Sequence, residues 1–355
     1  MSQRAKLNER YQHVLWATIR HYVATAEPVG SKKLIEEYDF RVSSATIRNV
    51  MGSLEKEGFL YQPHTSAGRV PSDSGYRVYV DELMVLDETP RRQLQETYAQ
   101  QLDWGAGNLD VLLQGAAQIL ATLSGQIALI LLPQTNRLRH LQLVQLGEQQ
   151  IALVVMTDAY QTQSLLVDLP AIAGAPTALA EGELQLLSNF LNHKLRGRSL
   201  SEIANLDWGD LDREFEHYAD VLRLVLTELT SRQQNLSTQA LVVRGVSDAL
   251  RQPEFSQLEQ VQMLLHLLEV EQSQLLPLIY ELPELAETKP QRVTVRIGAE
   301  NSLEPLNTCA LISANYFQRQ VPVGSVGLLG PTRMIYENAV VMVEATADYL
   351  SEALS

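Results

Sequence analysis

The feature that most constrains this chain is the spacing of its apolar residues, which changes several times along its 355 residues. Up to about residue 125, apart from two short strand-like runs within 59–71, the apolar residues recur every three or four positions, as they do on one face of a helix. Short strand-like runs follow between 127 and 169, helical spacing returns over 178–285, and further strand-like runs precede a closing helix. Strands, then helices, then strands predict a multidomain α+β fold in which a mainly helical insertion interrupts one α+β domain.

The first 80 residues predict three helices followed by two short strands. The breaker cluster Glu27-Pro28-Val29-Gly30 separates the first helix from the second. Strand-like runs over 59–62 and 68–71 flank a turn-rich loop. This order of elements is that of a winged helix-turn-helix domain. The expected N-caps are Asn8 for the first helix and Ser43 or Ser44 for the third.

The third predicted helix has one buried face and one outward face. The buried face follows from apolar residues at helical spacing, namely Ile47, Val50, Met51 and Leu54. The opposite side carries short or hydrogen-bonding side chains, and arginine and asparagine are the types that bond guanine and adenine edges. An ordinary solvated helix face is the alternative. The candidate DNA-reading residues on this helix are Ser44, Ala45, Thr46, Arg48 and Asn49.

The loop between the two predicted strands is the candidate wing of such a domain. Gly68 permits a tight turn there. Three side chains of the loop and its base are candidates to meet phosphate or a minor groove: His64, Thr65 and Arg69.

The distribution of charge supports a polyanionic partner for the N-terminal part. The chain carries a net charge of −14, which argues against a wholly basic nucleic-acid binder. Residues 1–80 nevertheless contain 11 basic and 8 acidic residues, whereas the remainder contains 17 basic and 34 acidic ones. A positive N-terminal part on an acidic chain indicates a nucleic-acid partner, with ordinary scatter of charge as the alternative.

The middle of the chain contains a candidate dimer seam. Six apolar residues are spaced alternately four and three apart, which is the a/d pattern of a packed helix pair. A core helix packing within its own subunit has the same spacing, and that alternative stays open. The residues of the candidate seam are Leu211, Phe215, Tyr218, Leu222, Val225 and Leu229.

The sequence offers no set of residues for catalysis, metal binding or a cofactor. Cys309 is the single cysteine, so no disulfide is expected within the chain, and this suits a reducing cytoplasm. No two of the seven histidines have the i, i+4 spacing of a helical metal site. Arg333 is expected to brace a domain contact, with an anion site at a helix N-terminus as the alternative. We expect no signal peptide and no membrane span, because no apolar run reaches about 18 residues.

Blocks of sequence at both ends of the chain together carry a family resemblance. They are Leu7–Arg10, Glu27–Ser31, Ala45–Asn49, Gln62–Pro71 and Gly75–Asp81 near the start, and Ile297–Asn301 and Gly327–Tyr336 near the end. In this order they closely resemble the HrcA family, the heat-inducible repressors of bacterial chaperone operons. The resemblance covers nearly the full length.

The resemblance implies a domain scheme and a function. The scheme has a winged-helix domain over 1–88, a linker and leading helix over 89–125, a GAF-like α+β domain over 126–177 and 286–355, and a dimerising insertion over 178–285. The implied function is repression of heat-shock operons by a homodimer bound to an inverted repeat operator in double-stranded DNA. The chaperonin is implied to maintain that activity. The implied location is the cytoplasm, with nucleoid association when the operator is bound.

Three positions of the third helix depart from the family pattern. Ser44 stands where proline is expected, Val50 where an acidic residue is expected, and Gly52 where alanine is expected. Gly52 weakens a helix by ~1 kcal/mol relative to alanine. These departures concern fine sequence preference rather than DNA binding itself.

Two other classes of function remain to be compared with DNA-dependent repression. In the first, a GAF-like pocket binds a small-molecule effector, and a ligand retained through purification would favour it. In the second, the α+β domain is an enzyme, which the lack of a clustered acid, base, nucleophile or metal set disfavours.

Overall fold

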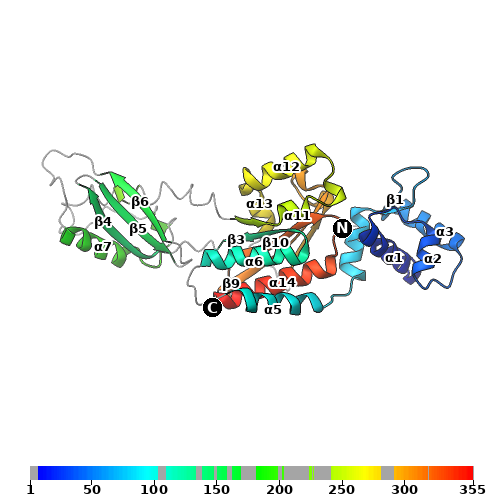
Figure 1. Cartoon of the computed structure of the whole chain (residues 1–355), viewed down its shortest axis with the longest axis horizontal. Coiled ribbons are helices and arrows are strands. Elements are labelled where there is room, and N and C mark those ends of the chain that lie inside the picture. The colour runs from blue at the N-terminus through cyan, green and yellow to red at the C-terminus, as the bar shows by residue number, and fades with distance from the viewer. Residues whose placement is uncertain are drawn as a thin grey trace. The chain divides into compact units, whose positions relative to one another are not determined.

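The computed structural model describes residues 7–102, 109–132, 138–147, 150–157, 162–168, 181–198, 202–203, 224–225, 227, 241–280, 292–318 and 320–354. Contacts divide the chain into two compact units (Figure 1). Unit 1 comprises Met1–Asp103, Gln114–Leu131 and Val242–Ser355, and unit 2 comprises Trp104–Leu113 and Leu132–Leu241. In the described part of the chain, no helix has the length and apolar character needed to cross a membrane.

The N-terminal part of unit 1 has the order of elements that the sequence predicts. Its elements are α1 (Glu9–Thr25), α2 (Ser31–Glu37), α3 (Ser44–Lys56), β1 (Leu60–Tyr61), β2 (Val70–Pro71), α4 (Asp73–Val78) and the π-helix η1 (Tyr79–Leu83). Asn8 caps α1, since its Oδ1 accepts a hydrogen bond of 3.0 Å from the Tyr11 amide. Ser43 caps α3 in the same way, with 3.2 Å to the Thr46 amide. Both predicted caps are therefore confirmed, with Ser43 rather than Ser44 at α3.

The core of this N-terminal part forms where α1 packs against α3. The four predicted inward residues of α3, Ile47, Val50, Met51 and Leu54, are all buried, which confirms that face of the helix. The strands β1 and β2 pair antiparallel, and an isolated bridge from Val29 to Arg69 extends the hairpin toward the segment before α2. Helix, hairpin and bridge thus fix the base of the loop between β1 and β2.

The rest of unit 1 is built on a five-stranded sheet. Its helices are α5 (Thr89–Gln101), α6 (Leu109–Ser124), α11 (Val246–Ala249), α12 (Leu258–Glu269), α13 (Gln272–Ile279) and α14 (Tyr336–Ala353). Its strands are β3 (Ile127–Leu131), β7 (Leu241–Arg244), β8 (Thr294–Ile297), β9 (Cys309–Gln318) and β10 (Val321–Pro331). The sheet order is β7-β3-β10-β9-β8, and β10 pairs antiparallel with both β3 and β9.

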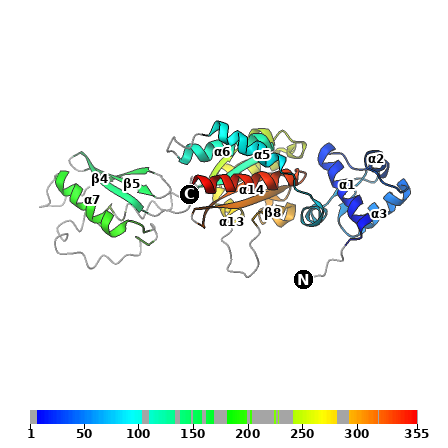
Figure 2. The ribbon, with the colours of Figure 1, turned by 90° about the horizontal axis from the view of Figure 1, so that it is seen from below.

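Helices cover both faces of this sheet. Figures 1 and 2 show α5, α6 and α14 on one face and α12 and α13 on the other. The Tyr98 hydroxyl joins the first three helices, because it lies 2.9 Å from Thr346 Oγ1 of α14 and 3.3 Å from the Ala116 carbonyl of α6. The predicted inward residues of α14 are buried, and they are Val340, Val343, Ala347 and Leu350.

Unit 2 contains a second, separate sheet. Its strands β4 (Leu138–Gly147), β5 (Gln150–Thr157) and β6 (Thr162–Asp168) form an antiparallel meander, and α7 (Glu181–Leu195) packs on β4. Alternate residues of each strand face α7, as a half-buried sheet requires. Among the buried residues of this core are Leu143, Leu153, Leu165, Leu187 and Leu191.

The structure divides the strands differently from the sequence expectation. Residues 126–177 were expected to join residues 286–355 in one domain, but only β3 of that stretch enters the five-stranded sheet. The strands β4, β5 and β6 belong to the sheet of unit 2. In addition, residues 178–285 are expected to form one mainly helical insertion, but β7, α11, α12 and α13 of that stretch belong to the five-stranded sheet of unit 1 and its helices. The physical reason is that apolar runs identify strands, whereas the sheet a strand joins depends on pairing with distant residues.

Gly52→Ala is expected to stabilise α3 by about 1 kcal/mol, because alanine is the better helix former. A Cβ at Gly52 meets no atom within 4 Å, so no clash opposes this gain. Hydrogen exchange of the α3 amides measures the effect, with a slowing of about fivefold expected.

Gly58→Ala is the matched control for this prediction. A Cβ at Gly58 also lies in open space, but the residue has φ +82°, which L side chains rarely adopt. This variant should therefore accelerate exchange at the end of α3. Faster exchange in Gly52→Ala would show that helix propensity does not limit the stability of α3.

Candidate nucleic-acid interface

The outward face of α3 presents the predicted DNA-reading residues in two groups. Ala45, Arg48 and Asn49 are exposed, while Ser44 and Thr46 are half-buried at the start of the helix. The Thr46 hydroxyl lies 3.0 Å from the Ser43 hydroxyl, so it takes part in the cap. Within the described residues, Arg48 and Asn49 make no side-chain hydrogen bond or ion pair. Their donors and acceptors are therefore available to an external partner.

The loop between β1 and β2 is held in shape from inside. The Gln62 side chain donates two hydrogen bonds of 2.9 Å, one to the Thr65 carbonyl and one to the Ala67 carbonyl. His64 and Thr65 are consequently exposed at the tip. Sequence reasoning missed Gln62, because glutamine has no characteristic position in such loops.

The base of the same loop depends on a glycine. A Cβ at Gly68 would lie 2.4 Å from the Val29 carbonyl oxygen, which is closer than real Cβ contacts. This close approach allows the Val29 and Arg69 amides each to donate a 2.8 Å hydrogen bond to the other residue's carbonyl. Gly68 thus serves a tight backbone approach at the base of the loop, and the prediction that it permits a tight turn at the tip is wrong.

Arg69 lies at the base of the loop but has a partner within the chain. Its Nε donates to Glu55 Oε2 of α3 at 3.0 Å, and its Nη2 lies 2.9 Å from the same oxygen. The guanidinium therefore braces the loop against α3. A phosphate contact by Arg69 stays a prediction, and it requires exchange of Glu55 for phosphate. No sequence spacing reveals this pair, because the β1–β2 hairpin brings the two residues together.

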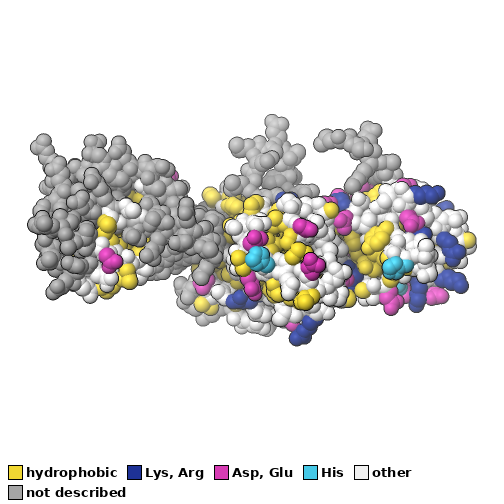
Figure 3. Space-filling view, turned by 90° about the horizontal axis from the view of Figure 1, so that it is seen from above, with side chains coloured by type: hydrophobic (Ala, Val, Ile, Leu, Met, Phe, Trp, Pro, Cys, Tyr) yellow, Lys and Arg dark blue, Asp and Glu magenta, His cyan; other side chains and the backbone are white. Residues whose placement is uncertain are grey.

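Basic side chains gather on the N-terminal part of unit 1. Figure 3 shows Lys and Arg side chains in dark blue at that end of the view, with acidic side chains among them. The exposed basic residues of this part are Arg10, Arg20, Lys32, Lys33, Arg41, Arg48 and Lys56. The positive charge that the sequence predicts is thus on the surface.

The predicted dimer seam lies almost wholly outside the described residues. Leu211, Phe215, Tyr218, Leu222 and Leu229 are not described, so their role stays a prediction. Val225 is described, and it is fully buried in the hydrophobic core of unit 2. At this one position the structure favours packing within the subunit, the alternative left open by the spacing.

The structure also locates two further residues that the sequence analysis singles out, and Arg333 has the role expected of it. Arg333 braces a contact, because its guanidinium donates to Glu254 and, at 2.7 Å, to the Val23 carbonyl at the end of α1. Cys309 is buried on β9, and burial raises the pKa of its thiol to about 11. A search of the described residues finds no group of three His, Cys, Asp or Glu side chains that could hold a metal ion.

Comparison of the sequence with known proteins identifies the class of protein. A family model described as "HrcA protein C terminal domain" matches residues 110–340. The protein "Heat-inducible transcription repressor HrcA" of Trichormus variabilis is 57% identical over 99% of each chain. The protein of the same name from Synechococcus elongatus is 53% identical, again over 99% of each chain.

A solved structure agrees with these relatives in fold. It is described as a hypothetical protein, is 25% identical, and superposes with a TM-score of 0.60 over 98% of this chain and 99% of its own. The α+β architecture and the named relatives define a transcription repressor rather than an enzyme. The chain belongs to the HrcA family of heat-inducible transcription repressors.

Proposed function

We propose that this chain represses chaperone operons by binding an inverted repeat in double-stranded DNA through its N-terminal part. The observation that carries this proposal is the two-sided α3 helix. One side is buried in the core, and the other presents Arg48 and Asn49 with free hydrogen-bonding groups. Arginine bonds the guanine edge and asparagine the adenine edge in the major groove, which is wide enough for a helix.

The same proposal assigns names to the domains. The N-terminal part, 1–88, is a winged-helix domain whose wing is the loop between β1 and β2, with His64, Thr65 and Arg69 as its DNA contacts. The five-stranded sheet with its helices is the GAF-like domain. The dimerising insertion is then the part of unit 2 that follows residue 177, without residues 242–285, which belong to unit 1. What supports this scheme is the order α1-α2-α3-β1-β2 and the position of the exposed loop beside α3.

A homodimer completes the proposed repressor. An inverted repeat has two-fold symmetry, so two copies related by the same symmetry match it. We propose that the insertion supplies the contact through the seam from Leu211 to Leu229, and that the chaperonin maintains the active dimer.

Arg48→Ala and Asn49→Ala are each expected to weaken operator binding by about 1–3 kcal/mol, because each removes a bidentate base contact. Titration of each variant against an inverted repeat from a chaperonin promoter measures the loss. The control is Arg251→Ala, which removes an arginine with an 82% exposed side chain outside the N-terminal part. If the two α3 variants bind as tightly as the control, α3 is not the recognition helix.

Glu55→Gln is expected to tighten binding to all DNA sequences alike. The variant removes a negative charge from α3 and releases Arg69 to contact a phosphate. One added phosphate contact steepens the log–log salt dependence of the affinity by about one unit. Adding Arg69→Ala to this variant should remove the added slope. If Glu55→Gln and the double variant both have the wild-type salt dependence of the affinity, the proposed wing contact is contradicted.

Leu222→Asp is expected to give a folded monomer that binds one half-site weakly. An unpaired carboxylate in a packed seam costs several kcal/mol, which is enough to separate two subunits. Mass in solution and titration of half and whole operators measure the two consequences. A variant that stays dimeric places the interface elsewhere, and one that unfolds favours packing of this helix within its own subunit.

A further inference from the structure

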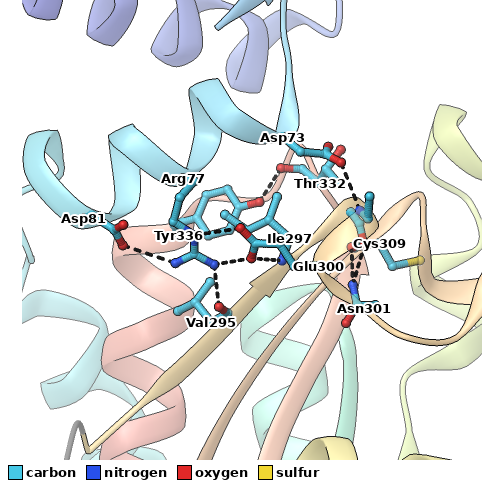
Figure 4. Close-up of polar contacts among 12 residues, drawn as sticks. Asp73, Arg77, Asp81, Val295, Ile297, Glu300, Asn301, Cys309, Thr332 and Tyr336 are labelled. Atoms are coloured by element: carbon cyan, nitrogen blue, oxygen red, sulfur yellow. Dashed lines mark hydrogen bonds and ion pairs between the residues drawn. The ribbon is translucent and has the colours of Figure 1, made fainter. Parts of the chain in front are cut away.

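The N-terminal part of unit 1 is held to the five-stranded sheet by polar contacts that do not involve α3. Arg77 of α4 is the centre of these contacts (Figure 4). Its Nε donates to Glu300 Oε1 at 2.9 Å, and its Nη2 donates to the Val295 carbonyl at 2.6 Å and to the other oxygen of Glu300. Its Nη1 donates to Asp81 at 3.1 Å, one turn further along. One side chain thus joins α4 to β8 and to the turn that follows it.

Asp73, at the start of α4, makes a second contact with the same turn. Its Oδ2 accepts a hydrogen bond of 3.0 Å from the Ala299 amide. The approach requires glycine at position 298, because a Cβ there would lie 2.1 Å from Asp73 Oδ2. Gly298 also has φ +52°, a conformation that glycine adopts without strain. The turn is therefore shaped to receive the Asp73 carboxylate.

A buried carboxylate on α14 makes a third contact. Glu337 is buried, and its carboxylate accepts hydrogen bonds from Arg20 of α1 and, at 3.2 Å, from the hydroxyl of Tyr79. Burial and the neighbouring Glu337 raise the pKa of Tyr79 to about 12, so the hydroxyl stays a donor at neutral pH. Both partners of Glu337 come from the N-terminal part. Separation of the two parts would break both contacts and expose the carboxylate to water, so this contact adds a modest, geometry-dependent preference for the docked orientation.

The covalent connection between the two parts cannot set their orientation by itself. Residues 84–88 link η1 to α5 without regular structure, and Val85 within them is 82% exposed. Residues 85–88 are exposed, so the orientation of the N-terminal part depends on contacts outside the linker. Arg333 with the Val23 carbonyl and the buried ring pair of Tyr76 and Tyr336 are two of them. Three more are the side-chain contacts of Asp73, Arg77 and Glu337 described above. We call these three contacts the α4 junction.

We propose that the α4 junction is a positioning device that sets the spacing at which two copies of the chain read the two halves of an inverted repeat. Asp73, Arg77 and Glu300 are then determinants of operator spacing, although none is assigned to touch DNA. This inference rests on the proposed function, since it requires a dimer whose α3 helices bind DNA.

The physical reason is the effective concentration of the second recognition helix. With one half-site bound, a rigid junction holds the second α3 where a half-site of one particular spacing lies. A loosened junction lets the second α3 occupy many positions. Its effective concentration then falls at a half-site of the preferred spacing and rises at half-sites of other spacings. Binding to a single half-site involves only α3 and the wing, so it does not depend on the junction.

Arg77→Met tests the proposal in the full-length protein. The readout is affinity for a half-site and for whole operators whose spacer is shortened or lengthened in steps of one base pair. The variant should lose about tenfold in affinity at the best spacing, with a flatter dependence on spacer length. Its half-site affinity should equal that of the wild type. Glu300→Gln is the second variant, because it removes the charge partner of Arg77 while keeping an acceptor for the Ile297 amide.

The matched control is Arg91→Met. Arg91 also pairs with several carboxylates. Glu344 and Asp348 lie on α14, and Glu88 is the N-cap of α5, so none of these contacts is part of the α4 junction. This variant should keep the wild-type spacing preference. Thermal unfolding of all variants shows which of them retain the fold.

Two results would overturn the proposal. In one, folded Arg77→Met and Glu300→Gln keep the spacing profile and affinity of the wild type. In the other, they lose half-site and whole-site affinity equally, which shows that they act by destabilising the N-terminal part. Failure of the wild-type protein to bind any half-site would instead overturn the proposed function, and this inference with it.

Discussion

The antiparallel pairing of β10 with β3 and β9 is the interaction on which the rest of unit 1 depends. It places Ser325 opposite Leu131 and so joins residues that are far apart in the sequence. In the same sheet β7 is the other neighbour of β3, so the strands on either side of residues 132–240 lie next to each other. The strand β10 is almost entirely buried, as expected for a central strand covered by helices on both faces. An insertion can therefore leave and re-enter the sheet without breaking its hydrogen-bond ladder.

The position of β10 also determines where α14 begins, and hence how the N-terminal part is held. The turn after β10 carries Arg333, whose guanidinium reaches the Val23 carbonyl at the end of α1. The first turn of α14 carries Glu337, which receives Arg20 and Tyr79. An anionic side chain is favoured at this place by the unpaired amides of the helix N-terminus. The strand β10, the first turn of α14 and the N-terminal part of unit 1 are thus connected by consecutive contacts.

Different faces of the helices in the N-terminal part form its core, contact the sheet and remain exposed. The inward face of α3 forms its core with α1, while α1, α4 and η1 provide the contacts to the sheet. The outward face of α3 and the loop beside it remain exposed. This separation of surfaces allows the exposed face of α3 and the orientation of the N-terminal part to be changed independently by substitution.

Features that depend on neighbours along the chain can be predicted from the amino-acid sequence. The caps Asn8 and Ser43, the buried faces of α3 and α14, and the existence of each strand from 127 to 169 follow from local spacing and capping chemistry. The signature blocks near both ends also placed the chain in its family before any geometry was known.

Contacts between residues far apart in the sequence, in contrast, are seen only in the folded chain. It assigned β3 to one sheet and β4, β5 and β6 to another, and it added the four-residue strand β7, too short for a periodic signal. It paired Arg69 with Glu55 and Arg77 with Glu300, although the second pair is separated by more than half of the sequence. The physical reason is that side-chain periodicity reports which face of an element is buried, whereas strand pairing and ion pairs depend on the partner that the whole fold brings near.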